Sequence, residues 1–189
     1  MCLLNLVKKK NHIRTKRFKF ELFNELISII GQKTKSKFCL SFLFLVIVKK
    51  NHMMTKKYLT DLIYQVNGAA IEVHKNIGAG LLENIYHQCM IKELSFRGIN
   101  FQSELIIPVE YKGLVLESDL RCDLFIENCL VLELKSVDQI IPVHIAKLMS
   151  YMKLLKSPIG LMINFNVTNI YHEGQKTYVN ELYRRLEDY

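Results

Sequence analysis

One short segment, Cys129 to Lys135, limits the fold of this 189-residue chain more than any other. It reads Cys-Leu-Val-Leu-Glu-Leu-Lys, which is apolar enough for a central strand of a β-sheet. Because side chains alternate along a strand, the three leucines point to one face, whereas Val131, Glu133 and Lys135 point to the other. The segment therefore predicts a carboxylate and an ammonium group about 7 Å apart on one face of a sheet.

The periodicity of the flanking residues predicts an α/β domain. Apolar residues at three- and four-residue spacing indicate two helices, over 60–77 and 82–94. The elements expected after them are strands over 101–111, 114–116, 121–126 and 129–136, a helix over 142–155, a buried strand over 159–165, a short strand over 169–172 and a closing helix over 177–186. Hairpin turns are expected at Lys112-Gly113 and Glu127-Asn128.

A second carboxylate lies ten residues before Glu133. A tight turn after the preceding strand brings Asp123 beside the Glu133 and Lys135 pair. Mg²⁺ prefers oxygen ligands and is usually held by one or two carboxylates plus substrate phosphate, so this grouping suits metal-dependent phosphodiester hydrolysis. Lys135 then orients a water or stabilises the negative transition state. A cross-strand ion pair on a half-exposed sheet face explains the same spacing, and the residues alone leave both interpretations open.

Two further segments carry polar groups suited to a site. Glu83 falls in the first turn of the second expected helix, where an acid also complements the helix dipole. His144, Lys147 and Tyr151 share one face of the helix over 142–155, at spacings of three and four. The lysine and the tyrosine can reach a phosphate from there, or can form an ordinary amphipathic border. A structural or surface role for the histidine is the plainer interpretation.

The basic charge of the chain is confined to its first quarter. Residues 1–52 hold twelve Lys and Arg against two Glu, whereas residues 53–189 hold fourteen basic and sixteen acidic residues. An inference from the net charge of +8 to a DNA-binding domain therefore fails. We expect the functional domain to begin at Met53 or Met54, with residues 1–52 forming an extension that results from an over-extended translation start. A basic arm for a membrane surface or for nucleic acid, and a part of the core, are the alternatives.

Hydropathy and cysteine usage exclude two classes of protein. The longest apolar stretch, Phe38 to Val48, has eleven residues, whereas a bilayer crossing needs about 20. The five cysteines form no CxxC pair, which is typical of reduced packing residues in a cytoplasmic protein. We therefore expect no membrane span and a cytoplasmic location.

Taken together, the segments resemble the GxxExxY protein family, a branch of the PD-(D/E)xK nuclease-like superfamily. Gly80, Glu83 and Tyr86 match the motif that names the family. Asp123 followed by Glu133-Leu134-Lys135 matches the superfamily signature D…(D/E)xK. Leu161 to Asn166 is similar to the late strand of the family with its Asn-Phe end, and the resemblance extends from about Thr60 to Val167.

The resemblance implies a restriction-endonuclease-like αβββαβ core, with a central mixed sheet flanked by helices, over residues 53–189. It also implies a Mg²⁺ or Mn²⁺ site formed by Glu83, Asp123 and Glu133, with Lys135 as the catalytic lysine. The chain departs from the family at Lys147, which stands where glutamine is usual, so a cation there either holds phosphate or competes with the metal. The expected function is metal-dependent cleavage of DNA or RNA, and the alternative is a catalytically inactive module that binds nucleic acid or protein.

Overall fold

The computed structural model describes residues 54–116 and 119–188. The chain divides into Met1–Met53 and Met54–Tyr189, and all described elements belong to the second of these units. The predictions for residues 1–52 lie outside the described residues. Among the described residues, no helix is both long and apolar enough to cross a membrane.

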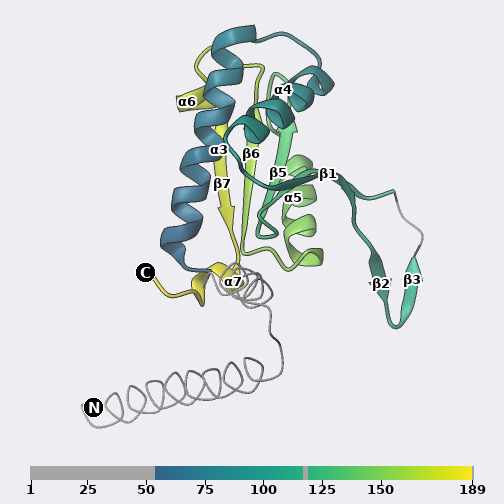
Figure 1. Cartoon of the computed structure of the whole chain (residues 1–189). Helices are drawn as coiled ribbons and strands as arrows, with labels where there is room; N and C mark the ends of the chain where they lie inside the picture. The colour runs from purple at the N-terminus through teal and green to yellow at the C-terminus, as the bar shows by residue number, and fades with distance from the viewer. Residues whose placement is uncertain (1–53, 117–118, 189) are drawn as a thin grey trace, which may run out of the picture. The chain divides into compact units, whose positions relative to one another are not determined.

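The second unit contains helices and strands, which follow the predicted order from α3 to β6 except that one expected strand is divided in two (Figure 1). Its elements are α3 (Lys56–Ile77), α4 (Glu83–Phe96), β1 (Phe101–Ile106), β2 (Val109–Tyr111), β3 (Leu114–Leu116), β4 (Arg121–Ile126), β5 (Leu130–Lys135), α5 (Pro142–Leu154), β6 (Ile159–Asn164), α6 (Ile170–Glu173), β7 (Gln175–Val179) and α7 (Glu181–Arg184). Five strands form a sheet in the order β1-β4-β5-β6-β7. The sheet is mixed, because β5 and β6 are parallel and the other neighbours are antiparallel.

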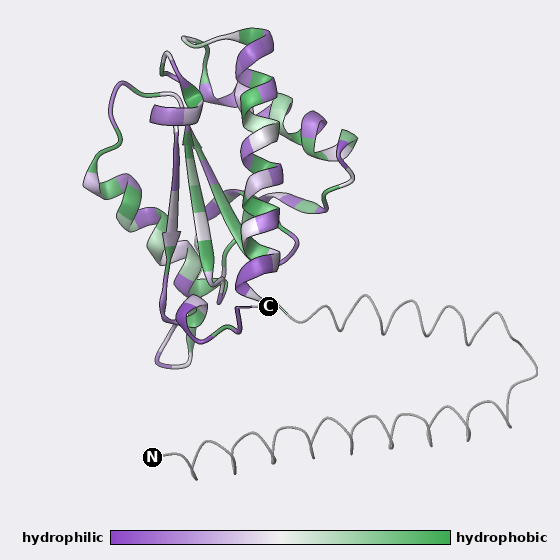
Figure 2. Ribbon diagram, turned by 90° about the vertical axis from the view of Figure 1, so that its left-hand side faces the viewer, coloured by the Kyte–Doolittle hydropathy of each residue, from purple (hydrophilic) through white to green (hydrophobic). Residues whose placement is uncertain are grey.

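The alternation of β5 divides the core into two layers. Leu130, Leu132 and Leu134 pack in one cluster with α3 and α4, whereas Val131 packs in the other with α5. The sheet is thus covered by α3 and α4 on one face and by α5 on the other, and the central strands are largely hydrophobic (Figure 2). The αβββαβ core that was expected corresponds to α4-β1-β4-β5-α5-β6, which confirms the predicted fold class.

Both predicted hairpin turns are present. Lys112 and Gly113 have φ values of 51° and 84°, and Glu127 and Asn128 have φ values of 47° and 54°. Two successive residues with positive φ are typical of a type I′ turn, which matches the twist of the strands that it joins. The second turn sets the register of β4 against β5, with Leu124 opposite Leu132.

Three expectations about the elements were wrong. The single strand over 101–111 is interrupted at Ile107 and Pro108, because a proline has no N–H to donate to a sheet. The strand over 169–172 is instead the short helix α6, whose N-terminus is capped by the Asn169 side chain. The first three residues of the expected closing helix belong to the strand β7, because pairing with the free edge of β6 outweighs local periodicity, and α7 begins only after Asn180.

Two of the cysteines behave as the packing residues that were predicted. Cys122 and Cys129 are buried and free of disulfides. Burial raises the pKa of the Cys122 thiol to about 11 and that of Cys129 to about 12, so both thiols stay protonated at neutral pH. Cys2 and Cys39 lie outside the described residues.

Candidate active site

Strand β5 buries two charged side chains in the middle of the sheet. Glu133 is 0% exposed and Lys135 is 7% exposed. The Lys135 Nζ lies 3.0 Å from Glu133 Oε1 and 3.3 Å from Glu83 Oε1, and it also contacts the Leu134 carbonyl oxygen. Buried charges carry a large desolvation cost unless they are paired, so the ammonium group and the two carboxylates stabilise one another.

Asp123 reaches the same place from β4. The pairing of β4 with β5 extends to Leu124 opposite Leu132, and the Oδ2 of the neighbouring Asp123 accepts a hydrogen bond of 2.7 Å from the Leu134 N–H. Burial raises the pKa of Asp123 to about 6, and the charges of Glu133 and Glu83 add to this effect. The Leu134 hydrogen bond and the Lys135 charge act in the opposite direction. The hairpin therefore brings a carboxylate to the Glu133 and Lys135 pair, as the sequence predicted.

The Gly80, Glu83 and Tyr86 motif places the third carboxylate. Gly80 has φ +88°, a conformation that side-chain-bearing residues rarely adopt, and it leads the chain into α4. The Tyr86 hydroxyl donates to the Gly78 carbonyl at 2.9 Å and accepts from the Leu81 N–H at 3.1 Å. The tyrosine is fully buried and thus ties the loop to the helix. Glu83 is held in the first turn, within reach of Lys135.

Asn164 and Phe165, at the end of β6, hold the backbone after β5 and the Tyr86 ring in place. Phe165 stacks on Tyr86 with ring centroids 4.4 Å apart, and its N–H donates to the Lys135 carbonyl at 2.8 Å. The Asn164 amide donates to the Val137 carbonyl at 2.7 Å and accepts from the Val137 N–H at 3.1 Å. The end of β6 therefore fixes both the chain that follows β5 and the ring that anchors α4.

Helix α5 contributes a second ammonium group. The Lys147 Nζ lies 2.6 Å from Glu133 Oε1 and 5.2 Å from the centre of the Tyr151 ring. Burial lowers the pKa of Lys147, but the hydrogen bond and charge of Glu133 more than offset this, so its pKa lies above the ordinary value. His144 does not line the cleft, because its Nδ1 accepts a long hydrogen bond (3.4 Å) from the Ile141 N–H at the start of the helix.

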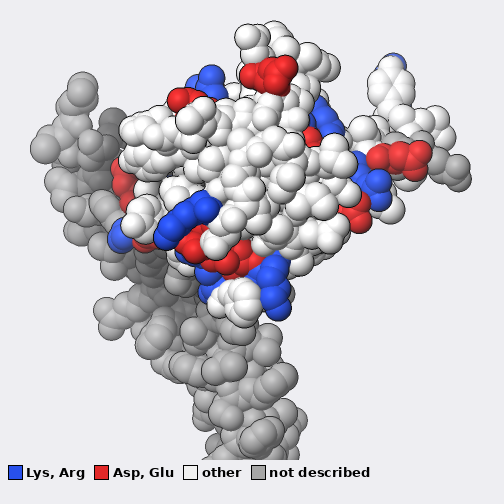
Figure 3. Space-filling model, turned by 90° about the horizontal axis from the view of Figure 1, so that it is seen from above, with Lys and Arg blue, Asp and Glu red and all other residues white. Residues whose placement is uncertain are grey.

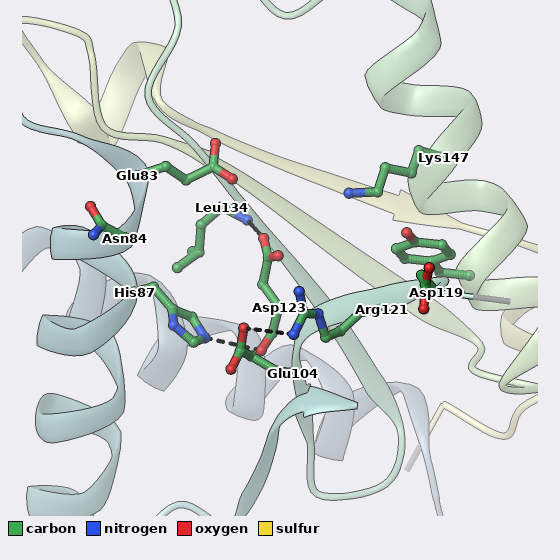
Figure 4. A pocket seen from close by; sticks show the side chains of 10 residues that line it. Glu83, Asn84, His87, Glu104, Asp119, Arg121, Asp123, Leu134 and Lys147 are labelled. Atoms are coloured by element: carbon green, nitrogen blue, oxygen red, sulfur yellow. Dashed lines mark hydrogen bonds and ion pairs between the residues drawn. The ribbon is translucent and has the colours of Figure 1, made fainter. Parts of the chain in front are cut away.

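These side chains surround a cleft of about 600 Å³ (Figure 4). Its lining consists of Glu83, Asn84, His87, Glu104, Asp119, Arg121, Asp123, Leu134, Lys147 and Tyr151. Glu83 faces the cleft from α4 and Lys147 from α5, with Asp123 between them (Figure 4). The cleft thus brings together two predicted metal ligands and two predicted substrate-binding residues, Lys147 and Tyr151, while Glu133 and Lys135 lie behind it in the sheet.

Comparison with known proteins identifies the family of this fold. Residues 47–177 match the PD-(D/E)XK nuclease superfamily. The chain belongs to this superfamily. Neither the curated proteins nor the solved structures include a significant match.

The acidic groups of this PD-(D/E)XK domain are not arranged as a closed metal centre. Among residues 54–116 and 119–188, no group of three His, Cys, Asp or Glu side chains converges closely enough to hold an ion. One carboxylate oxygen of the site nevertheless lacks a partner: the buried Glu133 Oε2 receives no hydrogen bond from the described residues. A buried carboxylate oxygen without a donor is costly, and it is the type of atom that a hard cation binds.

Sequence reasoning missed one histidine of the PD-(D/E)XK cleft. The His87 Nε2 lies 3.2 Å from the Asp123 carbonyl oxygen and 3.2 Å from Ser103 Oγ, and thus links α4 to β4 (Figure 4). His87 follows Glu83 by four residues, so helical spacing alone places the two on one face. Arg121 and Glu104 form an ion pair of 3.3 Å at the rim.

Proposed function

We propose that this PD-(D/E)XK domain hydrolyses phosphodiester bonds of DNA or RNA with Mg²⁺ or Mn²⁺ bound to its carboxylates. The observation that carries the proposal is the burial of Glu133 and Lys135 on the central strand, with Asp123 and Glu83 beside them. A structural ion pair does not require two lysines and three acids at one sheet end. The motif of Gly80, Glu83 and Tyr86 supports membership of the GxxExxY family within the superfamily.

The chemistry of the donor set suits a hard divalent cation, although the three carboxylates stand apart in the described structure. Glu83, Asp123 and Glu133 would have to converge to hold it, and the unpartnered Glu133 Oε2 is an oxygen available to it. When bound, the ion lowers the pKa of a bound water and offsets negative charge on the phosphate. Without it, the Lys135 and Lys147 ammonium groups supply the positive charge that Glu133 requires.

The protein residues have separate roles in this proposal. Lys135 is held by Glu83 and Glu133 and keeps a positive charge beside the reacting phosphate. Lys147 comes from the opposite wall and binds a phosphate oxygen of the substrate, with the Tyr151 ring beneath its ammonium group. His87 positions Asp123 by contacting the backbone carbonyl oxygen of Asp123. His144 receives no support as a substrate ligand, because it lies at the start of α5.

A second function, a module that binds nucleic acid or protein without cleavage, is favoured by one contact. Lys147 Nζ is 2.6 Å from Glu133 Oε1, so the carboxylate that a metal would use already holds a cation on one of its two oxygens. The surface charge also favours it. Residues 53–189 carry a small acidic excess, and basic and acidic side chains are intermixed in small groups on the face seen from above (Figure 3).

Metal binding and cleavage, measured separately, distinguish the two functions. The full chain is titrated with Mn²⁺ in a calorimeter, and is then assayed on single- and double-stranded DNA and RNA with Mg²⁺, with Mn²⁺ and with chelator. The metal-dependent nuclease predicts binding that is lost in Glu133→Gln. It also predicts cleavage that is lost both in this variant and in Lys135→Met.

Lys153→Met is the matched control for Lys135→Met, because Lys153 is an exposed lysine of α5 that does not line the cleft. It should retain both metal binding and cleavage. Well-folded protein that binds no Mn²⁺ and cleaves none of the four polymers would overturn the nuclease. If that same protein bound one of the four polymers, and chelator did not change the affinity, the binding module would be established instead.

A further inference from the structure

The ribbon formed by β2 and β3, residues Val109–Leu116, stands apart from the five-stranded sheet (Figure 1). Its register places Val109 opposite Leu116, and Tyr111 opposite Leu114. Directly opposite residues share a face, so these four side chains form a wholly apolar face, while Glu110 and Val115 lie on the other. Tyr111 and Leu114 are each 61% exposed. An isolated two-stranded ribbon is marginally stable in water, so an apolar face of this kind requires a partner.

The outer edge of β3 lacks the features that usually protect an edge strand. Natural edges are blocked by charged side chains, by prolines or by distorted backbone. The edge strand β7 carries Lys176, and the edge strand β1 carries Glu104 with its φ of +50°. The Leu114–Leu116 strand has neither a charge nor a kink, and among the described strands it pairs with β2 alone.

We propose that β3 pairs with β3 of a second copy of this chain around a two-fold axis. Antiparallel pairing centred on Val115 sets Leu114 against Leu116 of the second copy, and Val115 against its own counterpart. This register joins the two apolar faces into one, because opposite residues share a face. The inference goes beyond the proposed function and does not depend on it.

The charges of the ribbon favour a second copy of the chain as the partner and β3 as the edge that pairs. Pairing through β2 would set Glu110 near its own copy, which like-charge repulsion disfavours, whereas β3 brings no charges together. Nucleic acid is disfavoured, because the sequence from 104 to 121 contains four acidic residues (Glu104, Glu110, Glu117 and Asp119) against two basic ones (Lys112 and Arg121). The exposed apolar side chains offer on the order of 400 Å² per copy, which corresponds to a weak, concentration-dependent dimer.

Sedimentation equilibrium of the full chain, from about 1 μM to 1 mM, tests the proposal. Val115 is 69% exposed, so Val115→Lys leaves the fold intact but sets two ammonium groups against each other at the axis. It should raise the dimer dissociation constant roughly fivefold or more. An equimolar mixture of Val115→Lys and Val115→Glu should restore dimer formation between the two variants, since opposite charges then face each other.

Thr177→Lys is the matched control, because it adds the same charge to an exposed position of a different edge strand, β7. It should dimerise as the unsubstituted chain does. Protein that stays monomeric over the whole concentration range would overturn the proposal. So would a dimer that Val115→Lys leaves unchanged, because that dimer would use another surface.

Discussion

The environment of Asp123 opposes its charge, which makes the stability of the domain dependent on pH. Burial raises the pKa of this carboxyl from 3.8 to about 6. A carboxyl whose pKa is higher in the folded than in the unfolded state contributes stability at low pH. That contribution is complete below about 3.8 and is lost as the pH rises through about 6. Ionised Asp123 therefore destabilises the folded domain at neutral pH in the absence of metal.

Asp123→Asn removes this charge and keeps a side-chain oxygen that can accept from the Leu134 N–H. A pKa difference of about two units corresponds to about 3 kcal/mol, since each unit is worth roughly 1.4 kcal/mol. We therefore expect the variant to be more stable than the unsubstituted chain by about 2–3 kcal/mol at pH 8. The two should be nearly equal at pH 4, and the difference should develop between pH 4 and pH 6.

Urea unfolding measured by circular dichroism at several pH values, with chelator present, checks this expectation. Asp61→Asn is the control, because Asp61 is exposed on α3 and forms an ion pair with the exposed Lys57. Its effect should stay within about 0.5 kcal/mol at every pH. An Asp123→Asn variant that is less stable than the unsubstituted chain at pH 8 would refute the reasoning. Added Mn²⁺ should stabilise the unsubstituted chain more than the variant, because a ligand that binds the folded state shifts the equilibrium.

Three other substitutions test separate contacts. Lys147→Gln removes the ammonium group that contacts Glu133, so the affinity for Mn²⁺ measured by calorimetry should rise about tenfold. An unchanged affinity would contradict the competition between lysine and metal. Tyr86→Phe removes the hydroxyl that bridges Gly78 and Leu81. It should cost about 1–3 kcal/mol in urea unfolding, and a smaller loss would mean that the loop is held by other contacts. Gly160→Ala places a Cβ 2.6 Å from Met152 Sδ and should cost about 1–3 kcal/mol. A melting temperature equal to that of the unsubstituted chain would show that the methionine moves aside.

The parts of the fold that could be predicted depend on local patterns. The alternation of β5, the turn at Glu127-Asn128 and the motif around Glu83 each lie within a few consecutive residues. Their consequences in space follow from the geometry of one strand pair or one helical turn. For this reason Asp123 was placed correctly beside Glu133 and Lys135.

The parts that could not be predicted depend on contacts between distant segments. The segment over 177–186 has a helical spacing of apolar residues, and pairing with the free edge of β6 draws its first three residues into the strand β7. The contact between Lys147 and Glu133 depends on how α5 packs across the sheet, which no local pattern encodes. His87 was within reach of prediction, because it lies one helical turn after Glu83.

The stack of Tyr86 on Phe165 has a consequence for the order in which the cleft is assembled during synthesis. The ribosome completes every acidic residue of the cleft, together with Lys135, before it adds Phe165. Until then the Lys135 carbonyl lacks its hydrogen bond from the Phe165 N–H, and the Tyr86 ring lacks the ring on which it stacks. A nascent chain that ends before β6 therefore carries the side chains of the candidate site without the framework that aligns them, so the cleft takes its final form only after β6 has joined the sheet.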